Sequence, residues 1–305
     1  MNTIKLKFLV SFCLGVFGLF LASCNPDEES SGENKKRNDP YEIPDSLRMF
    51  IVEKGDSFAT FKIGAASFSM IKVKAGDFYM GAQSNDSMTI NYDKSADSLT
   101  ESPVHKVSLT EFHIGATEVT EALWYAVMGT GKESLSDGDV PISDVSYTDV
   151  TAFFARLNAA TLYTDSTMQE IASVKPTFVL PTEAQWEYAA RGGASSKGFL
   201  YAGSNALADV AWYLDNASSA QPVAKKLPNE LGLYDMSGNV MEWCQDRFDT
   251  LSYVSADQTD PISLNGKFSV VRSGSFQSKA EDCRVSSRKL FVSTYYNYIG
   301  FRLAY

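Results

Sequence analysis

The pattern of apolar and polar positions predicts short strands in the first half of the chain. Between residues 58 and 80, apolar residues recur in short runs that glycines interrupt. Short runs bounded by such turn residues are typical of strands joined by turns. Residues 104–114 alternate again, whereas residues 81–102 are polar and predict a long loop.

Helical periodicity is legible in three segments. The first covers residues 120–128 and ends at Gly129. The second begins at Ser146 and the third at Thr182, each with a carboxylate or amide residue three positions later, the spacing of a capping box. Few helices, many short strands and much irregular chain predict a compact α+β domain.

The N-terminus predicts export. Two lysines precede an apolar run at residues 8–21, and Leu-Ala-Ser then comes directly before Cys24. A positive start, a short apolar core and small residues are typical of a secretory signal, here residues 1–23, and the run is short for a membrane span. The cysteine resembles the lipobox of bacterial lipoproteins, which implies an acylated Cys24 and a lipid anchor in the outer membrane, on its periplasmic or its surface side. An ordinary signal with an accidental cysteine is the alternative.

Composition divides the mature chain into a tether and a domain. Residues 24–44 are polar and lack apolar periodicity, which predicts a flexible tether, and residues 45–305 are compatible with one domain. The formal net charge of the chain is −10. An acidic protein disfavours nucleic acid and anionic membrane surfaces, so we expect membrane contact only through the lipid on Cys24.

The sequence predicts different roles for the four cysteines. Cys13 lies in the signal and Cys24 would carry lipid, which leaves Cys244 and Cys283. In an oxidising compartment two remaining cysteines most often form a disulfide, and we expect that here. The alternative is a reactive Cys283 thiol whose pKa the neighbouring Arg284 lowers.

An ordered set of motifs carries a family resemblance. The motifs include F-Y-M-G (78–81), E-S-P-V-H-K-V (101–107), L-P-T-E-A-Q-W-E-Y-A-A-R-G-G (180–193), L-G-L-Y-D-M-S-G-N-V-M-E-W (231–243) and I-G-F-R-L (299–303). Together they resemble the formylglycine-generating enzyme family, also called the sulfatase-modifying-factor domain, over nearly all of residues 60–305. The resemblance implies an α+β fold related to C-type lectins, with little regular secondary structure.

The resemblance also raises the question of activity. Enzymes of this family oxidise a sulfatase cysteine to formylglycine, using oxygen and a copper ion held by two cysteines five residues apart. Aligning their Gly-Gly-Ser-aromatic stretch on residues 273–276 places Ser278 at the first copper position and Cys283 at the second. Because two thiolates suit copper(I) and a serine hydroxyl does not, we expect no copper and a catalytically silent domain. Cys283 would be catalytic only under the alternative, a sulfatase-modifying oxidase.

A structural calcium is the cofactor that the resemblance implies. The family binds it through two side chains and two backbone carbonyls, which correspond to Asp235, Gly238, Val240 and Glu242. Calcium prefers such hard oxygen ligands. The alternative is that both acids only cap turns.

The remaining charged candidates favour structural roles. Arg272, Arg288 and Arg302 are expected to pair with buried carboxylates, and a substrate carboxylate is the alternative partner. His105 and His113 are the two histidines of the chain. They are expected to have core and edge roles in one strand, because the iron enzymes related to this family use several histidines.

The C-terminal segment predicts a binding face. Residues 289–298 combine aromatic side chains with serine, threonine and asparagine, a mixture that resembles binding surfaces. In target proteins of diversity-generating retroelements, which share the lectin-like fold, the same stretch is the variable ligand-binding face. We expect a protein or glycan ligand on a face made of Ser275, Ser278, Trp243, Phe291, Tyr295, Tyr296 and Tyr298. Ordinary aromatic packing at a strand edge is the alternative.

Three functions follow from these patterns. The first is a cell-envelope lipoprotein whose silent domain binds a protein or glycan partner, for example in an envelope secretion or gliding assembly. The second is the sulfatase-modifying oxidase. The third is a retroelement-diversified, lectin-like binding protein.

Overall fold

The computed structural model describes residues 47–129, 139–164, 175–249, 253–292 and 294–305. The chain divides into two units, residues 1–40 and residues 41–305, and the fold below is that of the second unit. The expected signal peptide, the acylated Cys24 and the tether lie outside the described residues. No helix within the described ranges is long and apolar enough to cross a membrane.

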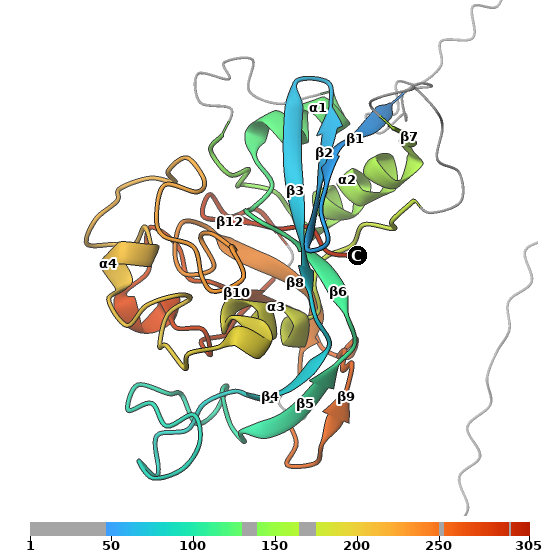
Figure 1. Ribbon diagram of the computed structural model, residues 1–305. Helices are drawn as coiled ribbons and strands as arrows, with labels where there is room; N and C mark the ends of the chain where they lie inside the picture. The colour runs from blue at the N-terminus through green and yellow to red at the C-terminus, as the bar shows by residue number, and fades with distance from the viewer. Residues whose placement is uncertain (1–46, 130–138, 165–174, 250–252, 293) are drawn as a thin grey trace, which may run out of the picture. The chain divides into compact units, whose positions relative to one another are not determined.

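A five-stranded sheet forms one part of the domain, in the order β6-β3-β2-β1-β7 (Figure 1). Its strands are β1 (Arg48–Lys54), β2 (Phe58–Ile63), β3 (Ala66–Val73), β6 (Phe112–Gly115) and β7 (Thr161–Thr164). β7 pairs with β1 in parallel, and the other neighbours are antiparallel. Alternate residues of β2 are buried, as the period-2 pattern predicts.

A four-stranded sheet lies at the centre, in the order β11-β10-β8-β12. Its strands are β8 (Met241–Phe248), β10 (Phe268–Arg272), β11 (Lys289–Phe291) and β12 (Ile299–Gly300). The central strand β8 is apolar at several positions and almost wholly buried, because neighbours cover both of its faces. This sheet positions the C-terminal motifs.

The remaining strands form a three-stranded sheet, in the order β4-β5-β9. It contains β4 (Gly76–Met80), β5 (His105–Leu109) and β9 (Gln258–Thr259). The single strand expected over residues 104–114 is therefore two strands: β5 pairs with β4, and β6 pairs with β3. The two histidines consequently lie in different sheets.

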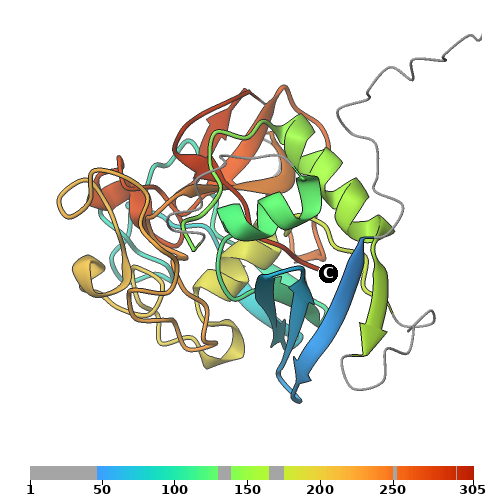
Figure 2. The same ribbon diagram turned by 90° about the horizontal axis from the view of Figure 1, so that it is seen from above.

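Three helices begin where the capping residues predict them. They are α1 (Glu121–Met128), α2 (Tyr147–Ala159) and α3 (Glu183–Ala190). Reciprocal capping boxes open α2 and α3, and α1 ends at a left-handed Gly129. Figure 2 shows α1 and α2 together on one side of the five-stranded sheet.

Two large clusters of buried side chains hold the sheets and helices together. The first joins the five-stranded sheet, α1 and α2 to Trp243 and Phe301, and the second joins α3 to the three-stranded and four-stranded sheets. Short helical segments, η1 (Gly193–Ser195), α4 (Leu207–Val210) and η2 (Ala280–Cys283), interrupt the long irregular region. An α+β fold with few helices and little regular secondary structure is confirmed.

Candidate functional site

A large cleft opens between α1 and four loop segments. Its volume is about 690 Å³, and its lining includes residues 140–145, 218–220 and 276–277 together with Tyr295 and Asn297. Cavities of several hundred Å³ are of the size that binds ligands. The cleft combines segments that are far apart in the sequence, so no single motif predicts it.

Backbone hydrogen bonds hold the walls of this cleft in place. The Glu121 amide donates to the Val140 carbonyl at 2.9 Å, and the Asp144 amide donates to the Tyr296 carbonyl at 3.0 Å. The Phe276 amide donates to a carbonyl at the end of the D-M-S-G-N motif, 2.8 Å away. The cleft is therefore preformed by main-chain contacts rather than by side chains alone.

The lining of the cleft is acidic and aromatic. The charged side chains among its described lining residues are Glu121, Asp144 and Asp149, all carboxylates. Asp149 already accepts hydrogen bonds from Ser146 in the α2 capping box. The aromatic lining comes from residues 124–125, Phe276 and Tyr295, so the cleft offers rigid contact area beside carboxylates.

The predicted aromatic face divides into one exposed and three packed residues. Tyr295 is 59% exposed and lines the cleft. Phe291 lies 4.9 Å from Tyr296 and 6.2 Å from Tyr298 between ring centroids, in edge-to-face contacts. These three rings also pack against the first core cluster. Aromatic packing, the alternative for this segment, therefore describes three of the four residues.

Three other members of the expected face are buried. Trp243 is fully buried, and its indole Nε1 donates to the Val145 carbonyl at 3.3 Å. Ser275 is 0% and Ser278 is 6% exposed. Their positions correct the expectation that they contribute to an exposed surface, because β8 and the loop after β10 run through the interior.

The two copper-ligand positions hold a serine hydroxyl and a buried thiol. The Ser278 hydroxyl accepts a hydrogen bond from the Ser275 amide at 3.0 Å. The Cys283 thiol is buried and lies 3.5 Å from the Lys279 carbonyl, to which it donates. Burial, together with a smaller contribution from the neighbouring Asp282, raises the pKa of Cys283 to about 12. Thiolate is the nucleophile, so without a metal beside it this thiol is a poor nucleophile at neutral pH.

Arg284 does not activate this thiol. Its guanidinium makes two bonds to the Glu101 carboxylate, at 2.8 and 2.6 Å, and one to Asp93 at 2.7 Å. The cation is thus neutralised by two carboxylates. The low thiol pKa expected for a reactive Cys283 is contradicted by its raised pKa.

The expected disulfide is not formed. Cys244 and Cys283 are both free and buried, Cys244 in the second core cluster and Cys283 in a third. A Cβ atom on Gly274 would lie 2.7 Å from the Cys283 sulfur. Gly274 comes after the end of β10 at Arg272, whereas Cys244 lies within β8. The geometry corrects the pairing that compartment and cysteine number predicted.

The calcium ligands expected from the family are only partly available. Asp235 Oδ1 has no hydrogen-bond partner among the described residues and fits a cation ligand. Both Glu242 oxygens accept bonds from Arg302, and the Gly238 carbonyl accepts one from the Ser273 hydroxyl at 2.9 Å. The four predicted ligands, Val240 included, would therefore have to rearrange before they could bind a calcium ion. Calcium binding there stays a prediction.

Glu118 is a buried acid that the sequence did not single out. It is 2% exposed, and neither carboxylate oxygen has a partner within the described ranges. Burial raises its pKa well above the usual range, and nearby Asp235 raises it further while Arg302 opposes the shift. The signal available in the sequence was an acid between apolar and small residues in A-T-E-V-T.

The three C-terminal arginines pair with buried carboxylates, as predicted. Arg272 contacts Glu183 at 3.2 Å and Glu187 at 2.5 Å. Arg288 also binds Glu183, and Arg302 binds the Glu242 carboxylate. Arg272 thereby connects α3 to β10, and Arg302 binds the central strand β8. All three arginines already have carboxylate partners within the protein.

Comparisons with known proteins agree with this architecture. A solved structure, Treponema denticola variable protein 1, superposes with a TM-score of 0.63 at 30% identity, covering 81% of this chain and 98% of that one. The formylglycine-generating enzyme of Streptomyces coelicolor is 29% identical over 271 residues, 72% of this chain and 82% of that protein. Chaperone protein LppX of Paenibacillus barcinonensis is 34% identical over 176 residues, 45% of this chain. The chain spans 63% of the length of LppX.

The family assignment rests on most of the domain. The model of the sulfatase-modifying factor enzyme 1-like domain matches residues 62–305, which include all three sheets apart from β1 and most of β2. The chain belongs to the sulfatase-modifying factor enzyme 1-like domain family.

Proposed function

We propose that this chain is an exported lipoprotein whose domain is catalytically silent and binds a protein or glycan partner in the cleft beside Tyr295. One contrast carries the proposal: the cleft is open, whereas the two copper-ligand positions hold a serine and a single buried cysteine. A copper(I) site needs soft thiolate ligands, which a serine does not supply, while a binding site needs only a preformed surface.

The relatives support binding without fixing the partner. The name of LppX describes a chaperone, and that of the Treponema denticola protein describes a variable protein. Neither name refers to sulfatase oxidation. A binding role in an envelope assembly is consistent with both names. The protein or glycan partner of this chain is itself proposed.

Export and anchoring belong to the same proposal. The apolar run before Cys24 supports a signal peptide and a lipid anchor, with the domain facing the periplasm or the cell surface from the outer membrane. Labelling cells with radioactive palmitate, with Cys24→Ser as control, tests the anchor. Label retained by the Cys24→Ser variant would contradict it.

Site-specific crosslinking tests the cleft as the binding site. A photoreactive phenylalanine at position 295 of the full-length lipoprotein would be activated in cells and compared with one at position 79. Tyr79 is 44% exposed on β4 and does not line the cleft, which makes it a matched control. We expect a discrete adduct from position 295 alone, protein or glycan by mass spectrometry. Equal adducts from both positions would contradict a specific site.

An activity assay tests the silent domain separately. The purified protein, supplied with copper and oxygen, would be incubated with a sulfatase-derived cysteine peptide. We expect no formylglycine product, detected by mass. Product formation that is lost in Cys283→Ser would establish the oxidase instead.

A diversified binding protein is the second candidate, favoured by the structural match to a protein named as variable. Genomic DNA tests it directly. A nearby near-copy of the final codons that differs only at adenines would support diversification of the segment around Tyr295. Without such a copy, the partner would be a fixed one.

A further inference from the structure

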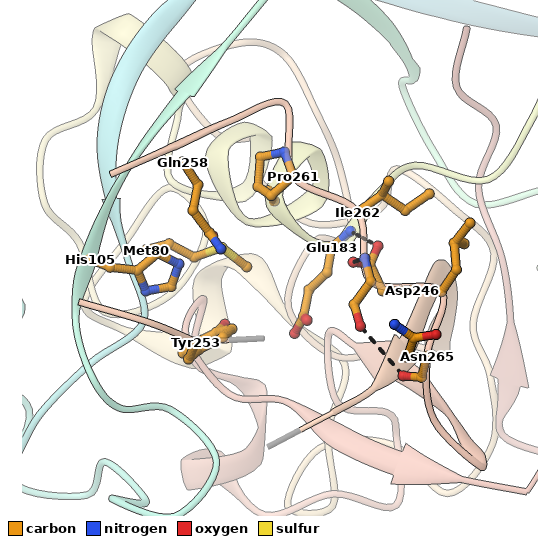
Figure 3. Close-up of a pocket in the computed structure, with 12 residues that line it drawn as sticks. Met80, His105, Glu183, Asp246, Tyr253, Gln258, Pro261, Ile262 and Asn265 are labelled. Carbon is orange, nitrogen blue, oxygen red and sulfur yellow. Dashed lines mark hydrogen bonds between the residues drawn. The ribbon is translucent and has the colours of Figure 1, made fainter. Parts of the chain in front are cut away.

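A second cavity lies apart from the cleft. Its volume is about 200 Å³, and none of its lining residues lines the cleft. Figure 3 shows His105, Met80 and Tyr253 on one side, Asp246 and Asn265 on the other, and Glu183 between them. The cavity is larger than one water molecule, whose share of liquid volume is about 30 Å³.

Two buried polar atoms on side chains that line this cavity lack partners among the described residues. They are His105 Nε2 and the Tyr253 hydroxyl, on side chains that are 2% and 6% exposed. His105 Nδ1 lies 2.9 Å from the Pro103 carbonyl, which can only accept a hydrogen bond. The proton is therefore on Nδ1, and Nε2 presents a lone pair. Leaving such buried groups unsatisfied is unfavourable, so the cavity is suited to an occupant.

The two rings are in direct contact. The His105 and Tyr253 ring centroids are 4.7 Å apart in an edge-to-face contact. Nε2 accepts a hydrogen bond, and the phenol donates one. A hydroxyl group can donate to the imidazole and accept from the phenol at the same time, which neither an ammonium nor a carboxylate can do.

The charged groups of the wall already have partners. The Glu183 carboxylate is bound by Arg272 and Arg288. Asp246 accepts hydrogen bonds from the Glu183 amide at 2.7 Å and the Ser263 amide at 2.9 Å. Because these acids are satisfied by the protein, an ionic occupant would bring a charge without a counter-charge. A neutral occupant is favoured.

The cavity also has apolar lining that suits carbon-bound hydrogens. Met80, Ile262 and Leu264 contribute to the wall. We propose that this cavity binds a small, neutral, polyhydroxylated molecule, a polyol or a single sugar residue, through a hydroxyl between His105 Nε2 and the Tyr253 phenol. The proposal is independent of the cleft and of any partner bound there.

Binding of two defined probes to the purified full-length protein tests this proposal. Glycerol and D-glucose would be titrated and followed by saturation-transfer NMR. Tyr253→Phe removes only the hydroxyl and keeps the ring beside Arg288, whose guanidinium lies 4.2 Å from the ring centroid. We expect roughly threefold to tenfold weaker binding in this variant, the effect of one neutral hydrogen bond. Tyr79→Phe, on β4 and outside the lining of both the cavity and the cleft, is the matched control and should bind as the wild type does.

A crystal structure of the wild-type protein grown with D-glucose gives a second, variant-free readout. A glucose hydroxyl within hydrogen-bond distance of both His105 Nε2 and the Tyr253 phenol would support the proposal. Ordered waters alone in the cavity, or binding of both probes that Tyr253→Phe leaves unchanged, would overturn it. Absence of binding by either probe in the titration would overturn it as well.

Discussion

Arg302 holds Glu242 with two parallel hydrogen bonds, Nε to Oε2 and Nη2 to Oε1, each 2.6 Å long. Both side chains are 0% exposed. The Trp186 indole donates to the same Oε2 at 2.7 Å, and the other guanidinium N–H groups donate to the Gly115 and Tyr234 carbonyls. One ion pair thus connects the central strand β8 to α3, to the end of β6 and to the D-M-S-G-N loop.

Breaking this pair is expected to destabilise the domain strongly. Glu242→Gln leaves the Arg302 charge uncompensated in the interior, and Arg302→Lys cannot reproduce the two parallel bonds. Removing one partner of a buried pair costs about 3–5 kcal/mol. Urea denaturation followed by tryptophan fluorescence measures the free energy of unfolding of each variant.

An exposed ion pair provides the control. Lys106 and Asp77 lie 2.8 Å apart on the surface. Surface pairs contribute little, so Lys106→Ala should leave the urea midpoint nearly unchanged. If Glu242→Gln shifted the midpoint no more than Lys106→Ala, the buried pair would not be stabilising the fold.

Two glycines in left-handed conformations form a second matched pair. Gly238 has φ +82°, and a Cβ there would lie 2.3 Å from the Trp212 carbonyl oxygen. Gly64 has φ +57°, and a Cβ there would meet nothing within 4 Å. Gly64→Ala should cost about 1–2 kcal/mol from backbone strain alone. Gly238→Ala adds a backbone clash and should destabilise well beyond that, measured as the drop in thermal midpoint; equal drops would refute the clash.

The sequence anticipated the parts of the fold that depend on local chemistry. Both capping boxes form as predicted, at Ser146 and at Thr182, because their hydrogen bonds join residues only three apart. β1 and β7 were not anticipated, since their parallel pairing joins segments more than a hundred residues apart. Residues 104–114 were read as one strand because alternation says nothing about which strand is the neighbour.

The site was less predictable, since exposure and proximity depend on tertiary structure. Composition marked residues 289–298 as a binding segment, but the fold exposes Tyr295 and packs Tyr296 against the core. The arginine pairs were foreseeable because a buried arginine requires a carboxylate. Glu118 and the cleft itself were not, because both are defined by neighbours distant in sequence.

The two buried cysteines give a prediction that separates thiol from disulfide. Cys244 and Cys283 are free, and burial raises the pKa of both thiols. Iodoacetamide should therefore modify neither in the folded protein and both in guanidinium without reductant. Mass spectrometry of the peptides that carry each cysteine provides the measurement. Alkylation that required prior reduction would reinstate the disulfide, and rapid labelling of folded Cys283 would reopen the oxidase.

Asp246 is expected to make stability depend on pH. Burial and the adjacent Glu183 raise the pKa of Asp246 from 3.8 to about 7, so the folded state holds this proton more tightly than the unfolded chain does. The stabilisation that this group contributes is complete below pH 3.8 and is lost as the pH rises through about 7. A shift of three pKa units changes the free energy of unfolding by about 4 kcal/mol at most.

The variant Asp246→Asn tests this dependence. Asp246→Asn does not titrate; its single oxygen can accept from only one of the two amides, of Glu183 or of Ser263, that Asp246 binds with separate oxygens. Urea unfolding of both proteins between pH 4.5 and 8 should therefore show the wild type losing stability relative to the variant as the pH rises. Parallel profiles would show that Asp246 titrates alike in the folded and unfolded states.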